Sequence, residues 1–495
     1  MQTILTTLLV LVGCSFLLAT IPTERSIQWR NMAWCYGLAL LLSLGHLVLQ
    51  VSSDAHAMLW FNTSVLSALM LPLVSFLALI LTRYFQRWFS LSLLSVWGVI
   101  SSNHMLVFFL AWLAISLCFH RLLMIFPNRP RAALAAHKKS IFARFAEFSL
   151  GLTFILFYLH WQSPWISDWL AQIPGDQTMP LPVLLQISAG LLVLTALIKC
   201  AQLPIHGWVI QVVESPTPVS ALLHAGIVNL GGFLIILFAP LISIAEPAKW
   251  LLLIWSGLST LIAALVMHTR VSVKVRLAWS TSAQMGFMLL ECALGYYELA
   301  VLHLLAHSLY KAHAFLNASS EVDHYLRHKL ARSSANSAIK VVGSLVLASL
   351  VVVAWHQVHV LHMAMAILYV LALTTLFNHL MRFTHWWLSI PLCALLFLAL
   401  YSGQLQALFS LYQSPQANLS VWELSLVCVF FLLFGTLYCL LRVAPKHPQS
   451  RRFYRWLYAG FYLDEWSTRL TLAMWPTKLP KAKPVSAKLY PQEML

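Results

Sequence analysis

Charged residues are scarce in this sequence. Asp, Glu, Lys and Arg make up 9% of its 495 residues, and hydrophobic residues make up 60%. Soluble domains carry about 25% charged residues, so this composition excludes a soluble globular protein. Acidic residues are the scarcer kind, with 15 Asp and Glu against 31 Lys and Arg. Charges inside the apolar segments are therefore few enough to be considered one by one.

Motifs for cofactors and nucleotides are also lacking. The eight cysteines fall in apolar segments without a C-x-x-C pair, so they are read as small hydrophobic residues rather than iron–sulfur ligands. Neither a G-x-G-x-x-G nor a G-x-x-x-x-G-K-[ST] motif occurs. We therefore expect no cofactor in this chain and no enzymatic reaction carried out by it.

Apolar runs, by contrast, recur along the whole chain. Hydropathy gives about fifteen runs, most of them long enough to cross a hydrocarbon core of about 30 Å. The first run lacks a basic flank and a cleavage site, so it is read as a retained helix rather than a signal peptide. The sequence thus predicts an all-α, polytopic transmembrane helix bundle. The predicted spans are residues 4–20, 33–51, 59–81, 89–101, 104–126, 141–161, 182–202, 217–242, 250–268, 276–293, 299–319, 338–355, 359–381, 385–408 and 421–443.

The net charge of +16 comes from basic residues that are distributed among the loops in the way expected of a membrane protein. Alternate loops carry the basic residues: Arg25, Arg30, Arg83, Arg87, Arg129, Arg131, Lys138, Lys139, Arg270, Lys274, Arg327, Lys329 and Arg332. The loops between them hold acids such as Asp54, Asp168 and Glu298. Since cytoplasmic loops are rich in Lys and Arg, this pattern predicts a multi-pass membrane protein with an external N-terminus and a cytoplasmic C-terminus. The basic residues then face anionic membrane lipid, and no nucleic acid partner is expected.

A change in composition divides the chain into residues 1–443, the transmembrane domain, and residues 444–495, a cytoplasmic tail. The tail contains the stretch "RRFYRWLYAGFYLDEWSTRL", in which aromatic and basic residues alternate. This mixture predicts a helix that lies on the membrane surface with its Trp and Tyr rings at headgroup level.

The first cluster of ionisable residues inside the apolar region lies around three prolines. Pro204, Pro216 and Pro218 interrupt the segment "KCAQLPIHGWVIQVVESPTPVSALLHAGIV", which predicts a discontinuous helix. Irregular backbone at membrane depth is tolerated where it lines protein or a water-filled cavity, and transporters place ion sites there. The candidate residues are Glu147, Lys199, His206, Glu214 and His224.

The second cluster lies on one helix. His303, His307 and Lys311 recur at i, i+4 and i+8, so they share one face of the predicted span 299–319. Two histidines four apart also suit a metal ion, but no carboxylate stands at the position that an H-E-x-x-H site requires. Because imidazole titrates at about pH 6.5, the pattern favours a proton relay through Glu147, the two lysines and the histidines, with water between them.

Three stretches of the sequence resemble one family. The segment from Lys199 resembles the K-S-A-Q-x-P…E-G-P-T-P-V-S-A-L-x-H-A motif of the proton-conducting subunits of respiratory complex I and of Mrp-type cation/proton antiporters. "SVKVRLAWSTSAQMGFM", which contains Lys274, and "LHLLAHSLYKAHAFL" resemble two further motifs of that family. The resemblance covers about residues 104–325. It implies two inverted five-helix repeats with broken helices, and it places Lys199, His224, His303, His307 and Lys311 in the proton path.

The sequence also departs from the family pattern. Leu113 stands where the family has a glutamate, and residues 341–362 lack the G-x-P…K segment that supplies a further lysine. These departures make the chain similar to the membrane subunits of two-component, energy-coupled inorganic carbon uptake systems. That resemblance implies a large cytoplasmic partner containing zinc and related to β-carbonic anhydrases. It also implies transport of H+ or Na+ that drives CO2 hydration in the partner.

Two other hypotheses remain open at this point. The chain could be an ordinary subunit of complex I or of an Mrp antiporter, although the missing lysine segment and the short tail disfavour this. It could also be a membrane anchor for an enzyme, with inactive charges. Against an anchor, the costly residues Lys199 and Lys311 have both been retained.

Overall fold

The computed structural model describes residues 2–21, 25–51, 60–82, 87–125, 129–173, 181–318, 338–356, 420–443 and 447–475, and four positions between 370 and 377. Within these residues the secondary structure is helical, apart from two isolated bridges that join Phe61 to Ser102 and His104 to Trp165. Helices satisfy their own backbone hydrogen bonds, which is what a chain this apolar needs in lipid. The all-α fold predicted from the sequence is confirmed.

The elements in chain order are α1 (Gln2–Leu18), α2 (Arg25–Val51), α3 (Val65–Ile80), α4 (Arg87–Ser101), α5 (Met105–Leu123), α6 (Pro130–Trp161), α7 (Ile166–Gln172), α8 (Val183–Lys199), α9 (Gly207–Gln211), η1 (Val212–Glu214), α10 (Thr217–Leu222), η2 (Leu223–Ile227), α11 (Leu230–Leu237), α12 (Ala239–Ile244), α13 (Glu246–Met267), α14 (Val273–Ala293), α15 (Tyr297–Leu316), α17 (Ala338–His356), α20 (Val421–Val443), α21 (Pro448–Tyr458), η3 (Gly460–Tyr462) and α22 (Leu463–Met474). The predicted spans overlap these helices, except that 385–408 and most of 359–381 lie outside the described residues.

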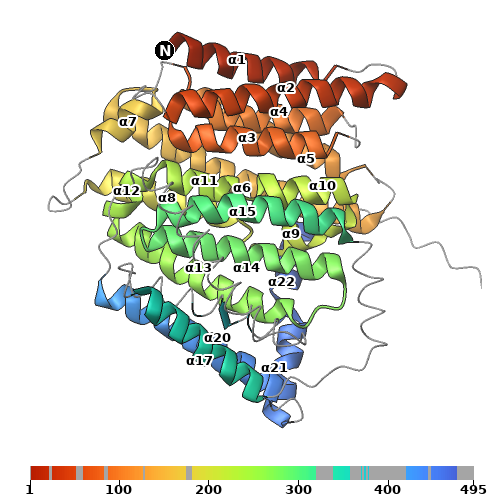
Figure 1. Cartoon of the computed structure of the whole chain (residues 1–495), viewed down its shortest axis with the longest axis vertical. Coiled ribbons are helices and arrows are strands. Elements are labelled where there is room, and N and C mark those ends of the chain that lie inside the picture. The colour runs from red at the N-terminus through yellow and green to blue at the C-terminus, as the bar shows by residue number, and fades with distance from the viewer. Residues whose placement is uncertain are drawn as a thin grey trace, which may run out of the picture.

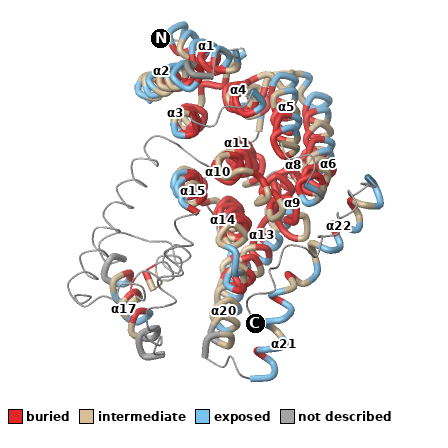
Figure 2. Tube along the Cα trace, turned by 90° about the vertical axis from the view of Figure 1, so that its right-hand side faces the viewer, coloured by how far each residue is buried: buried red, intermediate tan, exposed pale blue. Residues whose placement is uncertain are grey.

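The long helices lie side by side across the long axis of the molecule, with α1 to α4 at one end and α20 at the other (Figure 1). Seen along the helices, the buried residues concentrate around α8, α10, α11 and α14 (Figure 2). Six of the described helical segments are long and apolar enough to cross a membrane, and shorter apolar helices accompany them. The central helices therefore place their residues far from the outer surface of the bundle.

One feature of α6 corrects the sequence analysis. The loop assignment of Lys138 and Lys139 is wrong, because α6 begins at Pro130 and both lysines are buried within it. Proline is well suited to the first helical position, where its missing N–H costs nothing, and the following Ala-rich stretch favours a helix. Arg129 and Arg131 thus remain as the basic residues at this end of α6.

The first break predicted from the sequence, between α8 and α9, is confirmed. Ala201 adopts a left-handed conformation with φ of 51°, and the chain then turns through Pro204. Side chains from neighbouring helices satisfy the backbone groups that the break frees. Ser282 Oγ donates to Ala201 O at 2.7 Å, and Ser259 Oγ accepts from Leu203 N at 2.9 Å. The break is therefore a fixed part of the fold rather than a frayed helix end.

A second break follows between α10 and α11. Pro216 and Pro218 stand at the start of α10, and η2 is a π-helical turn that contains His224. Its wider ring is closed by Val228 N, which donates to Leu223 O at 3.0 Å. Since π-turns occur often at functional sites, this local geometry marks His224 as a residue of interest.

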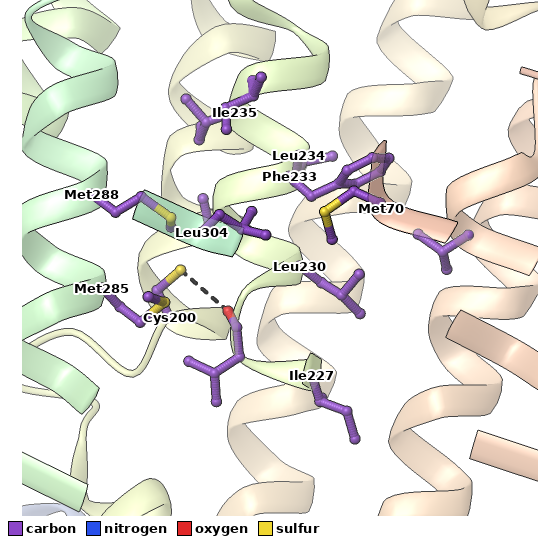
Figure 3. Packing of buried hydrophobic residues seen from close by; sticks show 14 of the residues in the cluster. Met70, Cys200, Ile227, Leu230, Phe233, Leu234, Ile235, Met285, Met288 and Leu304 are labelled. Atoms are coloured by element: carbon purple, nitrogen blue, oxygen red, sulfur yellow. Dashed lines mark hydrogen bonds between the residues drawn. The ribbon is translucent and has the colours of Figure 1, made fainter. Parts of the chain in front are cut away.

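Close packing around α11 holds the two breaks together. A Cβ at Gly231 would meet Cys200 and the backbone of Ala196 in α8, and one at Gly232 would meet Met288 in α14. The two glycines therefore let α11 fit tightly between α8 and α14. Figure 3 shows Met285 and Met288 beside Leu304 and Cys200, with a hydrogen bond of 3.4 Å from Cys200 Sγ to Val228 O.

The tail is anchored more firmly than a helix lying on a membrane surface. Helix α22 packs against α6 and α9. Lys138 Nζ donates to Asp464 Oδ1 at 2.8 Å and to Thr468 Oγ1 at 2.7 Å. Gln211 Nε2 donates to Asp464 Oδ2 at 3.1 Å. The division at residue 443 stays a prediction, but residues 463–474 belong to the packed body of the molecule.

Candidate functional site

Lys199 ends α8 at the first break and lies inside the bundle. Its Nζ is 4.5 Å from the centroid of the Trp112 ring, a cation–π contact from α5. The two side chains line a cavity of about 20 Å³, which Ser116, Lys139 and Trp208 also line. A cavity of this size is large enough for one water molecule, and the two lysines and Ser116 give that water polar partners on an otherwise mainly apolar wall. Lys199 therefore has room to exchange a proton with water.

Lys139 is a residue that the sequence analysis missed. Its amine donates to Ser116 O at 2.8 Å and lies 5.7 Å from the centroid of the Phe119 ring. It lines the same cavity as Lys199. The spacing of eight residues between Lys139 and Glu147, two turns of one helix, was the signal that could have identified it.

Glu147 supplies the negative charge in this region. Arg144 NH2 lies 2.9 Å from Glu147 Oε2, and the Arg144 side chain is 45% exposed whereas that of Glu147 is 5% exposed. The charges of Lys139 and Lys199 also act on Glu147. Glu147 thus pairs with a partly exposed arginine and interacts electrostatically with two buried lysines, and its place in a relay stays a prediction.

His224 and Asn229 connect this region with α14 and α15. His224 Nδ1 lies 3.0 Å from Thr281 Oγ1, and its ring stacks on Phe315 with 4.3 Å between centroids. Asn229 Nδ2 donates to Ser308 Oγ at 2.6 Å. The polar residues of the second break therefore reach across to the helix that carries the second cluster.

Lys311 is fully buried in that second cluster. Its Nζ donates to Leu277 O at 3.1 Å and to Ser280 Oγ at 2.6 Å, both in α14. No carboxylate of the described residues lies within ion-pair distance of it. A carbonyl and a hydroxyl hold the amine in place without fixing its charge as a carboxylate would.

The two histidines of α15 lie on the same side as Lys311. His303 Nδ1 is 3.0 Å from Glu291 Oε2, and His303 Nε2 is 2.9 Å from Gln284 Oε1. The ring centroids of His303 and His307 are 6.2 Å apart. The sequence analysis also missed Glu291, a buried carboxylate near the end of α14.

The remaining predicted residues lie elsewhere. Glu214 is partly exposed and lies 3.7 Å from Arg131 NH1, and Lys274 Nζ donates to Ser215 O at 3.5 Å. These two residues lie at one end of the cluster rather than within it. His206 is buried, with its ring 4.6 Å from that of Trp279 and next to the Gly207 that contacts Asp464.

Several buried polar atoms along this route have no hydrogen-bond partner among the described residues. They are Trp208 Nε1, His224 Nε2, Asn229 Oδ1, His307 Nδ1 and His307 Nε2. Buried polar groups normally bond to protein or ordered water. Trp208 lines the Lys199 cavity and His307 lies on α15 with Lys311, so water molecules bonded to these atoms would hydrate both clusters of titratable residues.

This chain is similar to known membrane proteins over its whole length. A family model described as NADH:quinone oxidoreductase/Mrp antiporter, TM matches residues 102–358. The probable inorganic carbon transporter subunit DabB of Hydrogenovibrio crunogenus is 44% identical over 525 residues, which cover 100% of this chain and 99% of that protein. This chain belongs to the family of antiporter-like membrane subunits. The resemblance noted in the sequence is thereby confirmed.

Two further relatives extend the comparison. Subunit DabB2 of Halothiobacillus neapolitanus, also a probable inorganic carbon transporter subunit, is 33% identical over 94% of this chain and 92% of its own. The structure of the Mrp complex from Dietzia sp. DQ12-45-1b superimposes with a TM-score of 0.64 at 18% identity. That match covers 96% of this chain and 59% of the other. The chain is therefore a multi-pass membrane protein with the antiporter-like fold.

Proposed function

We propose that this chain is the proton-translocating membrane subunit of a two-component inorganic carbon uptake system. The observation that carries the proposal is the burial of Glu147, Lys199, His224, His307 and Lys311 in a chain whose full-length relative is named as a probable inorganic carbon transporter subunit. The membrane potential supplies about 2.3 kcal/mol per charge per 100 mV, so each proton biases a coupled step by tens-fold.

Protons fit this route better than Na+ does. Sodium needs several oxygen ligands, whereas the buried titratable groups are mainly amines and imidazoles. Protonated, these groups repel a cation, and in the neutral form they accept a proton. The route is therefore suited to moving H+ between nitrogen atoms with water between them.

The chemistry on carbon belongs to a second subunit in this proposal. The partner is a large cytoplasmic protein that contains zinc and resembles β-carbonic anhydrases, and proton flow makes its CO2 hydration unidirectional. The chain lies in the bacterial inner membrane, with its N-terminus outside and the α21–α22 tail at the cytoplasmic face. There the exposed rings of Tyr454, Trp456 and Trp466 meet the lipid headgroups.

A growth test separates this function from a proton-pumping subunit of complex I or of an Mrp antiporter, the alternative that the family also allows. In cells without carbonic anhydrases, the chain and the gene of its zinc partner should together restore growth in ordinary air, and either gene alone should fail. An uncoupler should stop accumulation of labelled inorganic carbon within seconds, before ATP falls. Uptake that survives the uncoupler and ends only with ATP depletion would reject the proposal. Complex I subunits co-purifying with the chain would favour the alternative.

A further inference from the structure

Glu291 and His303 form a hydrogen-bonded pair at the far end of the second cluster. Helices α14 and α15 are consecutive and packed together, joined by a short turn in which Gly295 has a φ of 77°. Lys311 bonds to the first turns of α14, whereas His303 bonds to Glu291 near its last turn. His303 and Lys311 are eight residues apart, or about 12 Å along α15. The pair therefore lies towards the turn that joins the two helices.

Glu291 is unusual among the paired carboxylates of the described residues. Its partner is a histidine, whereas the others face lysine or arginine. The Glu291 side chain is 3% exposed and that of His303 is 12% exposed. A buried carboxylate is costly unless its partner is charged or it takes up a proton. Because a histidine can change its charge at neutral pH, this pair can exchange a proton that a lysine or arginine would retain.

Gln284 lets the pair keep its hydrogen bonds in both states. Its side-chain amide lies 2.9 Å from His303 Nε2 and can present either its oxygen or its NH2 group. The oxygen accepts from a protonated Nε2, and the NH2 group donates to an unprotonated one. His303 can therefore gain or lose a proton without leaving a buried ring nitrogen unpaired.

We propose that Glu291 and His303 form the terminal proton-binding station of the path, with Gln284 as a positioning residue. Through this station protons pass between His307 and the membrane face at the α14–α15 turn. The inference deepens the proposed function and rests on it. It assigns this role to a carboxylate and a histidine in a chain whose residues 341–362 lack the lysine segment of the family.

A proton crosses the pair of Glu291 and His303 by exchange at both nitrogens of the imidazole ring. When the Gln284 amide turns away from His303 Nε2, a proton from water bonded to His307 adds to that nitrogen and makes an imidazolium. The Nδ1 proton then passes to Glu291 Oε2, breaking an N–H bond and forming an O–H bond. The carboxyl group releases that proton to water at the turn. The starting tautomer returns when His303 Nε2 gives its proton to water and Nδ1 takes up a proton from water. The same steps in reverse carry a proton inward.

The test uses the full complex in proteoliposomes with an imposed pH gradient. Glu291→Gln should lower the rate of gradient-driven carbon accumulation about tenfold or more, because proton transfer by a placed group contributes about 10²–10⁴-fold. Glu291→Asp, which keeps the titratable group, should retain most of the rate. A wild-type rate in Glu291→Gln alongside an inactive Lys199→Ala would overturn the station and leave the proposed function intact. Accumulation that ignores the gradient in the wild type would overturn both.

The matched control is Glu423→Gln. Glu423 is another buried carboxylate, but its partner is Lys249, whose Nζ lies 2.6 Å from Glu423 Oε1 outside the proposed path. Per amount of assembled complex, its rate should stay within about twofold of wild type, since removing a structural pair changes stability rather than proton transfer. An equal loss of rate in both variants would overturn the assignment.

A second measurement needs no variant. A hydrophobic carbodiimide modifies protonated buried carboxyl groups, so it should label the Glu291 peptide of the wild-type complex. Lowering the pH on the side of the α14–α15 turn should increase this labelling. Lowering the pH on the opposite side, in the absence of an uncoupler, should change the labelling less. Equal responses from the two sides, or no labelling at all, would overturn the inference.

Discussion

Lys311, which is buried, and Lys249, whose side chain is 13% exposed, are both held by neighbouring side chains or backbone, but by opposite means. Lys249, in α13, has two carboxylates within reach, Glu423 at 2.6 Å and Glu246 at 3.1 Å. Lys311, in α15, has a backbone carbonyl and the Ser280 hydroxyl. Two acids stabilise the charged amine of Lys249, so it keeps its proton. The partners of Lys311 accept hydrogen bonds from either form of the amine.

The difference shows that an amine of the helix bundle can be held either by carboxylates or by neutral hydrogen-bond acceptors. Lys249 joins α13 to α20 through its ion pair with Glu423. Lys311 instead adjoins His307, whose two ring nitrogens have no partner among the described residues. A lysine whose charge can change, next to groups that water must satisfy, suits proton movement. A lysine between two carboxylates suits attachment of one helix to another.

The largest expected effect is the loss of transport when a path lysine is removed. Lys311→Ala and Lys199→Ala should each lower gradient-driven carbon uptake by about 100-fold or more, because a missing relay member interrupts every transfer. His303→Ala combined with His307→Ala should do the same. Uptake of labelled inorganic carbon measures the rate, and membrane insertion and co-purification with the partner confirm folding. Wild-type uptake in the Lys199 variant would remove Lys199 from the path.

Lys249→Met should lower the stability of the protein and leave its transport rate unchanged, the opposite of what is expected for the path lysines. It leaves Glu423, whose side chain is 1% exposed, without its nearest cation. Breaking a buried pair in this way costs about 3–5 kcal/mol, reduced here because the Lys249 side chain is 13% exposed and water reaches it. Thermal unfolding in detergent should show a lower midpoint, with uptake per folded molecule unchanged. Reduced uptake at unchanged stability would contradict the comparison.

The sequence predicted the helices, both breaks and the common face of His303, His307 and Lys311. These features depend on local patterns, since apolar length, proline position and helical spacing are all visible in one dimension. The positions of the broken segments relative to their neighbours are not local. Ser282 of α14 and Ser259 of α13 satisfy the backbone hydrogen bonds that the first break frees. The sequence around these two serines does not predict this contact.

Lys139 and Glu291 were missed for two different reasons. Lys139 follows Arg129 and Arg131 in a basic stretch that is typical of a cytoplasmic loop, although Pro130 at the start of the Ala-rich stretch already indicated a helix. Glu291 was hidden within the apolar span 276–293. A lone acid inside a membrane span is a functional candidate by itself, but its partner His303 lies on the next helix.

Lys138 and Lys139 are neighbours in α6, so they allow a structural lysine and a cavity lysine to be compared within one helix. Lys139→Met should lower uptake about tenfold, since Lys139 shares a cavity with Lys199 and its charge acts on Glu147. Lys138→Met is the control, because Lys138 bonds to Asp464 on α22 and not to the cavity. It should lower stability and leave uptake per folded molecule near wild type. Equal losses of uptake in both variants would mean that Lys139 acts only through packing.

The smallest effect is expected at the anchor of the tail. Asp464→Asn removes the charge that faces Lys138 but keeps an oxygen that can accept from it, and Thr468 Oγ1 still accepts at 2.7 Å. The Asp464 side chain is 33% exposed, so solvent weakens the ion pair and the cost should be about 1 kcal/mol. This loss should raise the rate of proteolysis after the exposed Arg469, because α22 leaves α6 more often. Glu465→Gln, at an exposed neighbouring position, should change that rate less. If both variants were cleaved at the wild-type rate, the contact between Lys138 and Asp464 would not hold α22 on the bundle, and the tail would be attached by its apolar side chains alone.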